Sequence, residues 1–470
     1  MAAERPAAAE PPAWVRTELG TADLGDGRLT QRLLRIVAAF GAHPDASIPQ
    51  ASGTWGQAKA AYRFLANAKV TPEQILKPHQ QATTDRTKPE RVVLAVQDTT
   101  TLNYTRHAAT TGLGLIDDKP DHQGLLVHST VAFTPERVPL GLLHQQTWTR
   151  SPAEHGKTEA RRERPTEAKE SQKWRNSLKA TEAVQREAPD TQLINIGDRE
   201  ADVYDLFLDA AQGRCALLVR AAWDRRVEHP ERYLWAAVEA APPAGTLTVH
   251  VPRTRDRAER SAEVTVRFCP LTLRPPRHRP QLAPVAIWAV SLHEPAPPPG
   301  TEPLEWLLLT TLPVTTFADA VRIAEYYAVR FMIELFHKVL KSGCRIEARQ
   351  LQAAARLERC LALLSIVAWR VMALTLLGRA VPDLPCTALF EDWEWQALYC
   401  FVHQTTEPPA APPSLAEAVR LVARVGGFLG RRRDGPPGVI VLWRGMQVLS
   451  VIAAAWRAFG PPRTVQSRSP

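Results

Sequence analysis

The pattern of apolar and polar positions divides the chain into regions of different predicted structure. Residues 14 to 75 have the spacing of amphipathic helices, and in TQRLLRIVAAF the apolar residues fall on one helical face. The segment VHSTVAFTPERVPLGLLHQQTW, at 127 to 148, predicts a hairpin that turns at its Pro-Glu pair. Short apolar or alternating runs between about 212 and 312 predict further strands, and from 318 onward the spacing predicts helices.

Two strands of buried type are each followed by an aspartate. The run VVLAV precedes Gln97 and Asp98, and the run LINI precedes Gly197 and Asp198. Adjacent strands of a mixed α/β sheet can bring two such residues together although they are far apart in the chain. A single carboxylate at a strand end is commonly a turn or helix cap, and Asp98 before two threonines fits that role alone. A shared site and separate caps therefore stand as alternatives.

A third segment places polar residues on a predicted helix. In YYAVRFMIELFHKVLK, a projection at about 100° per residue puts six polar residues in one narrow sector: Tyr327, Arg330, Glu334, His337, Lys338 and Lys341. Phe331 and the other apolar residues cover the rest, which predicts a mostly buried helix with a narrow polar stripe. The alternative is a solvent-facing edge with (i, i+4) ion pairs, each worth only a few tenths of a kcal/mol.

Composition narrows the class of protein. The 470 residues are 45% hydrophobic and 23% charged, as in globular chains, and the net charge of +9 favours a polyanionic partner such as nucleic acid. Six scattered cysteines without a CxxC pair indicate neither a zinc ribbon nor a disulfide framework, which suits a reducing cytosol. The acidic, proline-containing N-terminus is not typical of a secretory signal, and charged residues interrupt the apolar C-terminal run. We therefore expect a soluble protein.

These motifs together resemble a known family. The spacing Y-x2-R-x3-E-x6-K from Tyr327 to Lys341 follows DREAD at Asp198 and QDTTTLNY at Asp98. That order is similar to the insertion-sequence-four family of bacterial DDE transposases with the YREK signature, in a pattern close to that of the Tn-five transposase. The similarity runs from about residue 14 to 460 and includes AYRFLAN, VHS, GLLHQ, WLLLT and GGFLGRRRDG. Four ordered motifs are more specific than any one of them.

The resemblance implies an α/β fold with an RNase H-like catalytic core. It implies a helical DNA-binding domain for transposon ends at 1-75, a catalytic domain at 76-372 with a β-rich insertion at about 225-305, and a helical dimerisation domain at 373-470. The implied function is a cut-and-paste DNA transposase in the bacterial cytoplasm, associated with the nucleoid when bound to DNA. Its homodimer would bind inverted-repeat ends in double-stranded DNA, cleave them through a hairpin intermediate, and join them to target DNA.

The catalytic acids of the family correspond to Asp98, Asp198 and Glu334. The resemblance implies that they hold two Mg²⁺ ions, with Mn²⁺ possible, and that Asp98 bridges the pair. Phosphodiester cleavage puts negative charge on the attacking and the leaving oxygen, and two cations about 3.5 to 4 Å apart can stabilise both. Because Mg²⁺ prefers carboxylate oxygen and water as ligands, three acids suit this chemistry.

The resemblance also implies eight DNA-contacting residues: Tyr327, Arg330, Lys338, Lys341, Arg220, Trp306, Arg28 and Arg32. Tyr327, Arg330 and Lys341 would bind phosphates beside the scissile bond, and arginine can do so with two parallel hydrogen bonds. Trp306 matches a tryptophan that packs against a flipped base, and Arg220 matches an arginine beside it. A tryptophan considered alone is more often a core residue.

Some positions depart from the family, and other classes of protein compete. Ala222 stands where a second basic residue is expected, which leaves hairpin handling open, and Phe331 stands where the close relative has tryptophan.

GKT at 156 to 158 is similar to part of a phosphate-binding loop, but Ser151 replaces the required first glycine. A glycosidase could use paired carboxylates but would not need the basic signature helix. The serious alternative is a catalytically silent DNA-binding relic or transposition inhibitor, which would bind DNA without metal-dependent cleavage.

Overall fold

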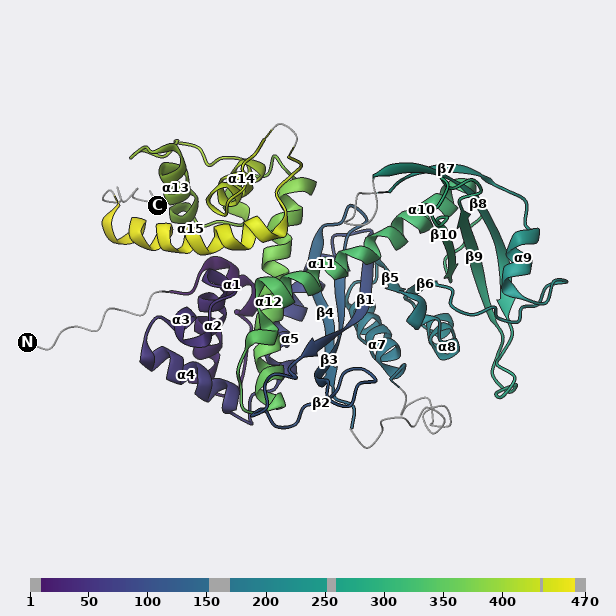
Figure 1. The fold of residues 1–470 in the computed structure, drawn as a ribbon, viewed down its shortest axis with the longest axis horizontal. Coiled ribbons are helices and arrows are strands. Elements are labelled where there is room, and N and C mark those ends of the chain that lie inside the picture. Colours follow the sequence, from purple (N-terminus) through teal and green to yellow (C-terminus); the bar gives the residue numbers. More distant parts are fainter. Residues whose placement is uncertain (1–9, 152–169, 252–258, 432–433, 461–470) are drawn as a thin grey trace, which may run out of the picture. The chain divides into compact units, whose positions relative to one another are not determined.

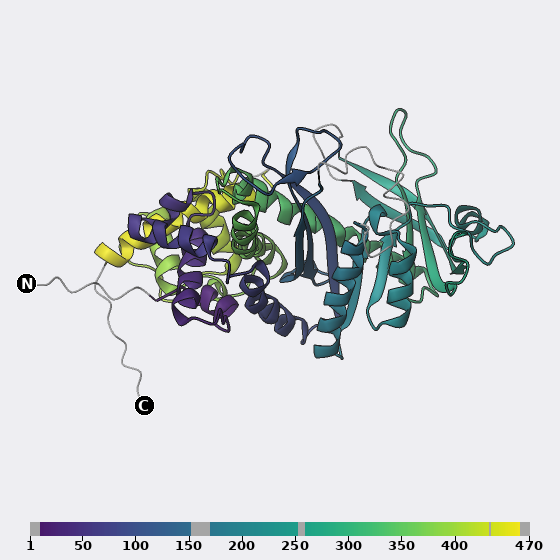
Figure 2. The ribbon, with the colours of Figure 1, turned by 90° about the horizontal axis from the view of Figure 1, so that it is seen from below.

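The computed structural model describes residues 10–151, 170–251, 259–431 and 434–460, and the chain divides into two compact units (Figures 1 and 2). The helical unit comprises Met1–Ala82, Thr101–Leu125 and Glu334–Pro470, and the sheet unit comprises Thr83–Thr100 and Leu126–Ile333. The GKT segment at 156 to 158 lies outside the described residues. Each unit is therefore assembled from segments that are far apart in the chain.

The sheet unit is built on a mixed β-sheet. Across the sheet the strands follow the order β3, β1, β5, β6, β10, β9, β8 and β7, and β4 pairs with β3. Their bounds are β1 Val92–Asn103, β3 Gln123–Phe133, β4 Pro139–Trp148, β5 Gln192–Gly197, β6 Ala216–Arg220, β7 Gly245–Val251, β8 Arg260–Leu273, β9 Val285–His293 and β10 Glu305–Thr310. β1, β5 and β6 are parallel, and the strands from β6 through β10 to β7 are antiparallel. The strands of the predicted β-rich insertion thus continue the same sheet.

Helices pack against the central strands of this sheet. α7 (Gln172–Glu187) contacts β5, and α8 (Tyr204–Gln212) contacts β6, as Figure 1 shows. The apolar cluster there includes Trp174, Leu178, Leu193, Phe207 and Leu217. The remaining helical segments of the unit are η3 (Arg199–Ala201), α9 (Leu234–Ala240), α10 (Phe317–Ala328) and η4 (Val329–Phe331). Both α7 and α8 are connections between strands, which places Asp198 at the start of such a connection.

The predicted hairpin is confirmed. β3 and β4 are antiparallel partners. The chain turns between Thr134 and Val138, where the Val138 carbonyl accepts the Thr134 N–H at 3.0 Å and Arg137 adopts a positive φ of 68°. Proline and glutamate occupy the tip, as the sequence indicates.

The helical unit packs around one long buried helix, α12. Its helical segments are α1 Ala13–Leu19, α2 Gly27–Ala42, α3 Ile48–Ser52, α4 Trp55–Ala66, α5 Pro72–Thr87 with its last turn in the sheet unit, α11 Met332–Lys338 from Glu334 onward, η5 Val339–Gly343, η6 Ile346–Ala348, α12 Ala354–Ala380, η7 Cys386–Ala388, α13 Asp392–His403, α14 Leu415–Val425 and α15 Val439–Phe459. A two-residue strand, β2 (Gly114–Leu115), pairs with Gln123 and Gly124. Arg370 of α12 is buried and lies over the Trp14 ring of α1 at 4.4 Å. α12 also contacts α2, α4, α14 and α15, so N-terminal and C-terminal helices pack on the same helix.

α12 and α15 are both long and apolar enough to cross a membrane by length and composition alone. The core helix of a soluble protein passes the same test, and 94% of the apolar window of α12 is buried. α15 packs as an amphipathic helix, because Leu442, Met446, Leu449 and Ala453 join an apolar cluster with α13 and α14. The predicted packing role of the C-terminal run agrees with this arrangement.

The buried strand predicted at VVLAV is β1, which continues through Asp98 to Asn103, so this aspartate lies within a strand. One expectation about local structure is wrong. The signature segment is not one regular α-helix: α10 ends at Ala328, a 3-10 turn follows, α11 ends at Lys338, and a π turn follows that. The projection at 100° per residue therefore fails. Phe331, assigned to the buried face, is 41% exposed.

Candidate active site

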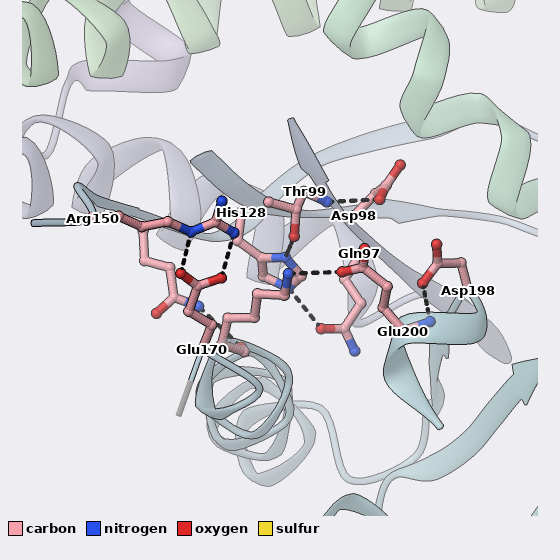
Figure 3. Close-up of polar contacts among 10 residues, drawn as sticks. Gln97, Asp98, Thr99, His128, Arg150, Glu170, Asp198 and Glu200 are labelled. Atoms are coloured by element: carbon pink, nitrogen blue, oxygen red, sulfur yellow. Dashed lines mark hydrogen bonds and ion pairs between the residues drawn. The ribbon is translucent and has the colours of Figure 1, made fainter. Parts of the chain in front are cut away.

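Asp98 and Asp198 occupy matched positions on neighbouring parallel strands. β1 and β5 are paired in register as far as Val96 and Ile196, and each aspartate comes two residues after those partners. Neighbouring strands lie about 4.8 Å apart. The two acids therefore start from adjacent points of the sheet, and Figure 3 draws both of them.

Backbone donors hold both carboxylates. Asp198 directly follows β5 and caps the 3-10 helix η3, where the Glu200 N–H donates to its Oδ1 at 2.8 Å. The Thr99 N–H donates to Asp98 Oδ1 at 2.7 Å. The capping alternative is thus correct for Asp198, where the cap uses one carboxylate oxygen, whereas Asp98 stands within a strand and caps no helix.

The protein environment makes the charge on Asp198 costly. Burial raises the pKa of its carboxyl, while the Glu200 N–H and the charges of Arg330 and Lys173 act in the opposite direction. A half-buried carboxylate gains more from a nearby cation than a fully solvated one does. The site is therefore electrostatically suited to a hard cation, which prefers oxygen ligands.

A basic and aromatic cluster faces the aspartates. Arg330, in the 3-10 turn η4, places Nη1 3.8 Å from Asp98 Oδ2, and its guanidinium lies 4.3 Å from the centre of the Phe331 ring. Tyr327 is 2% exposed, and burial raises the pKa of its hydroxyl to about 12. The charges of Arg330 and Arg220 act in the opposite direction and lower this pKa. The tyrosine thus keeps its proton and can act as a hydrogen-bond donor.

Trp306 and Arg220 belong to the same cluster. They lie on paired strands, and Arg220 donates from Nη2 to the carbonyl of Glu305, the neighbour of Trp306, at 2.7 Å. The Trp306 ring meets Tyr327 edge-on at 5.1 Å and lies nearly parallel to Phe331 at 6.4 Å. Phe331, one of the two positions at which the sequence was expected to depart from the family pattern, therefore lies beside Trp306.

Sequence reasoning missed one basic member of this cluster, Arg199. It is exposed and follows Asp198 directly, and together with burial its charge lowers the pKa of Arg220. The signal available in the sequence was its place in the DREAD segment, in which the acidic residues were considered as site residues and Arg199 was not. Arg199 adds to the positive charge next to the two acids.

Glu334, Lys338 and Lys341 lie in the helical unit, whose position relative to the aspartates is not determined. Glu334 and Lys338 are exposed on α11, and Lys341 is half-buried in the π turn. Burial, with Lys341 beside it, lowers the pKa of His337 to about 3, so this imidazole adds no positive charge. Within the described residues, no three His, Cys, Asp or Glu side chains gather as a metal-binding group.

Arg28 and Arg32 lie one turn apart on α2. Asp26 caps this helix by accepting the Arg28 N–H at 2.7 Å. Arg28 is exposed and Arg32 is half-exposed, whereas Leu33 and Val37 are buried. The helix thus presents basic groups to solvent while its apolar face packs in the helical unit.

The second aspartate of the DREAD segment, Asp202, has a structural role. It is 3% exposed, accepts the N–H groups of Ala222 and Trp223 at 2.8 and 3.1 Å, and forms an ion pair with Arg225. Arg226 donates to the Pro275 carbonyl. The two arginines that follow Ala222 are therefore engaged within the protein.

Two segments of the chain match known protein families. Residues 11–70 match the transposase DNA-binding family, and residues 366–460 match the Tn5 transposase dimerisation domain. Both segments belong to the helical unit, and neither includes residues of the sheet unit. The first segment contains Arg28 and Arg32. Together the matches support a Tn5-like DNA transposase that binds DNA and forms a dimer.

One solved structure similar to this chain is the cryo-EM structure of the piggyBac transposase synaptic complex with hairpin DNA. The TM-score is 0.36 at 9% sequence identity, over 96% of this chain and 79% of that chain. This similarity is too low to support an argument about fold or ligand.

Proposed function

We propose that this protein is a cut-and-paste DDE transposase of the insertion-sequence-four type with the YREK signature. The catalytic part of the proposal rests on one observation: Asp98 in β1 and Asp198 directly after β5 occupy matched positions, and Arg330 lies beside Asp98. The family matches at both ends of the chain support the DNA and dimer parts. The substrates are the inverted-repeat ends of an insertion sequence and a target DNA, and the site of action is the bacterial cytoplasm.

The proposed architecture has an RNase H-like catalytic core between two helical domains. A DNA-binding domain at 1-75 and a dimerisation domain at 373-470 flank a catalytic domain at 76-372, in which residues of about 225-305 form a β-rich insertion. A mixed sheet with parallel β1, β5 and β6 at its centre is consistent with such a core. In the homodimer, each catalytic core would cut the DNA end bound chiefly by its partner.

Asp98, Asp198 and Glu334 are the proposed ligands of two Mg²⁺ or Mn²⁺ ions. The oxygen donors and the raised pKa of Asp198 fit a hard cation, and the third acid would come from the helical unit. When bound, such ions stabilise negative charge on the attacking and the leaving oxygen of the phosphodiester. In this proposal the scissile phosphate would lie next to Asp98 and Asp198.

The basic and aromatic residues are proposed to hold the DNA in that place. Arg330 can bind a phosphate with two hydrogen bonds, and Tyr327 and Lys341 add single donors, with Lys338 on the adjacent turn. Trp306 offers a stacking face for a base extruded from the duplex, beside Arg220. Arg28 and Arg32 would contact phosphates of the transposon end. A hairpin intermediate is part of the proposal, although Ala222 lacks the basic side chain expected there.

The test uses DNA flanking this gene that contains short inverted repeats. The purified protein with Mg²⁺ should cut at the repeats, and Asp198→Asn should bind them without cutting. Asparagine is the matched control because its amide oxygen can still accept the Glu200 N–H that Asp198 accepts at 2.8 Å. Binding without metal-dependent cleavage by the wild-type protein would favour the alternative, a catalytically silent relic or transposition inhibitor.

A further inference from the structure

A chain of buried polar side chains runs beneath the two aspartates. His128 of β3, Gln97 of β1 and Asn195 of β5 are each 0% exposed. His128 Nε2 lies 3.0 Å from Gln97 Oε1, His128 Nδ1 lies 2.9 Å from Thr99 Oγ1, and Gln97 Nε2 donates to Asn195 Oδ1. Asn195 Nδ2 then donates to Thr181 of α7 at 2.9 Å. Figure 3 shows His128 between Gln97 and Thr99.

The direction of these hydrogen bonds places a proton on one nitrogen of the imidazole. Because Gln97 donates through its amide nitrogen to Asn195, its oxygen must be the acceptor that faces His128. Nε2 of His128 therefore carries a proton, and Nδ1 shares a hydrogen bond with the Thr99 hydroxyl at 2.9 Å. Each of these polar atoms has its partner, as a buried polar network requires.

The network holds the residues on both sides of Asp98 in the chain. Successive side chains of a strand point to opposite faces, so Gln97 and Thr99 lie on the face of β1 opposite to Asp98. One imidazole thus holds the residue before and the residue after this aspartate. Asn195 extends the same chain to β5, three residues before Asp198. The hydrogen bonds therefore join the two strands from which the acids start.

An aromatic contact ties the network to the second aspartate. The His128 ring meets the Trp174 ring edge-on at 4.6 Å. Trp174 in turn packs on Gly197, where an added Cβ would lie 3.2 Å from Cζ3 of the indole. Gly197 directly precedes Asp198, so the backbone before each acid is held by a side chain that contacts His128.

We infer that His128 is a positioning residue, which sets the separation and orientation of Asp98 and Asp198 for metal binding through this network. The inference rests on the proposed function. An apolar side chain of similar volume would fill the same space, but it could not fix Gln97 and Thr99 together. Outer groups that orient metal ligands typically contribute about 10- to 100-fold in metal affinity.

The test measures Mn²⁺ binding to the full chain on DNA ends, by the electron paramagnetic resonance of free Mn²⁺. His128→Leu should weaken Mn²⁺ binding roughly ten-fold or more, while DNA-end affinity stays unchanged. His128→Gln, which can still donate to Gln97, should restore part of the loss. Thr99→Val removes only the hydroxyl that bonds to His128 Nδ1. This variant replaces His128→Leu in the test if His128→Leu does not fold.

Thr130→Val is the matched control. Thr130 lies two residues after His128 on β3, is also 0% exposed, and donates to Ser177 Oγ at 2.8 Å, a hydrogen bond separate from those that join His128 to Gln97 and Thr99. Its loss should lower the unfolding temperature but leave Mn²⁺ affinity unchanged. Equal Mn²⁺ affinity in wild type, His128→Leu and Thr99→Val would overturn the positioning role alone. Wild-type protein that binds no more Mn²⁺ than Asp198→Asn would instead refute the metal site, and both proposals with it.

Discussion

Arg330 Nη1 lies 3.8 Å from Asp98 Oδ2, so a residue proposed to bind DNA also forms an ion pair with a proposed metal ligand. The guanidinium is 10% exposed and lies over the Phe331 ring. This arrangement places positive charge next to the carboxylate without DNA present. A phosphate that enters here would compete with Asp98 for the same donor.

This geometry predicts that Arg330→Lys cleaves DNA ends about 10²-fold more slowly, the usual effect of losing one donor placed at developing charge. Lysine keeps the charge but loses the planar fork and the stacking on Phe331. The rate of end cleavage in single turnover measures the effect. Arg322→Lys is the control, because Arg322 lies on the preceding helix α10 and pairs there with Asp319. Similar rates for both variants would contradict the prediction.

The raised pKa of Asp198 predicts a pH-dependent stability difference. In metal-free protein, the folded state holds this proton more tightly than the unfolded state, whose carboxyl titrates near pH 3.9. Stability is therefore lost as the pH rises through the folded-state pKa. Asp198→Asn carries no such proton, so it should be more stable at pH 7, and this advantage should shrink toward pH 4. Urea unfolding with EDTA at several pH values tests this, and a constant difference would count against it.

Close packing at Gly197 predicts that Gly197→Ala is destabilising by roughly 1–3 kcal/mol. A Cβ at this position would clash with Ala201 Cβ and lie 3.2 Å from Trp174 Cζ3. The matched control is the double variant Gly197→Ala with Ala201→Gly, which removes the first clash. Thermal unfolding of both variants and of Ala201→Gly completes a double-mutant cycle. Additive effects would show that the two positions do not compete for space.

The exposed basic groups of α2 predict a salt-dependent affinity for DNA ends. Removing one phosphate contact should reduce the slope of log K against log salt by about 0.9. Arg28→Ala and Arg32→Ala should each show this reduction in fluorescence anisotropy titrations over a range of salt. Arg16→Ala is the control, because Arg16 pairs with Glu10 and donates to the Pro11 carbonyl. An unchanged slope in both α2 variants would exclude these residues as phosphate contacts.

Local sequence patterns predicted the strands and most helices because their apolar spacing is set by the residues themselves. The interruption of the signature helix could not be predicted in this way, since a 3-10 turn at Val329–Phe331 and a π turn at Val339–Gly343 depend on distant packing. The matched placement of Asp98 and Asp198 required the pairing of β1 with β5, which the sequence only allowed.

The buried network beneath the aspartates was also missed. The partners of His128 are contributed by another strand, and Asn195 is 98 residues from Gln97 in the chain. One signal was available, because His128, Ser129 and Thr130 interrupt an otherwise apolar strand that is buried throughout this stretch. Polar residues at fully buried strand positions need partners, and the partners point to the neighbouring strands.

The buried ion pair of Asp202 and Arg225 bears on how mutants of this protein are interpreted. Removing one partner of a buried pair commonly costs about 3–5 kcal/mol. A screen that scores transposition alone would place Asp202 beside Asp198 as an essential acid of one motif. Measuring protein abundance distinguishes the two inactive variants. Asp198→Asn should accumulate normally, whereas Asp202→Asn should be depleted, because the carboxylate that holds residues 221–226 through Ala222, Trp223 and Arg225 is lost.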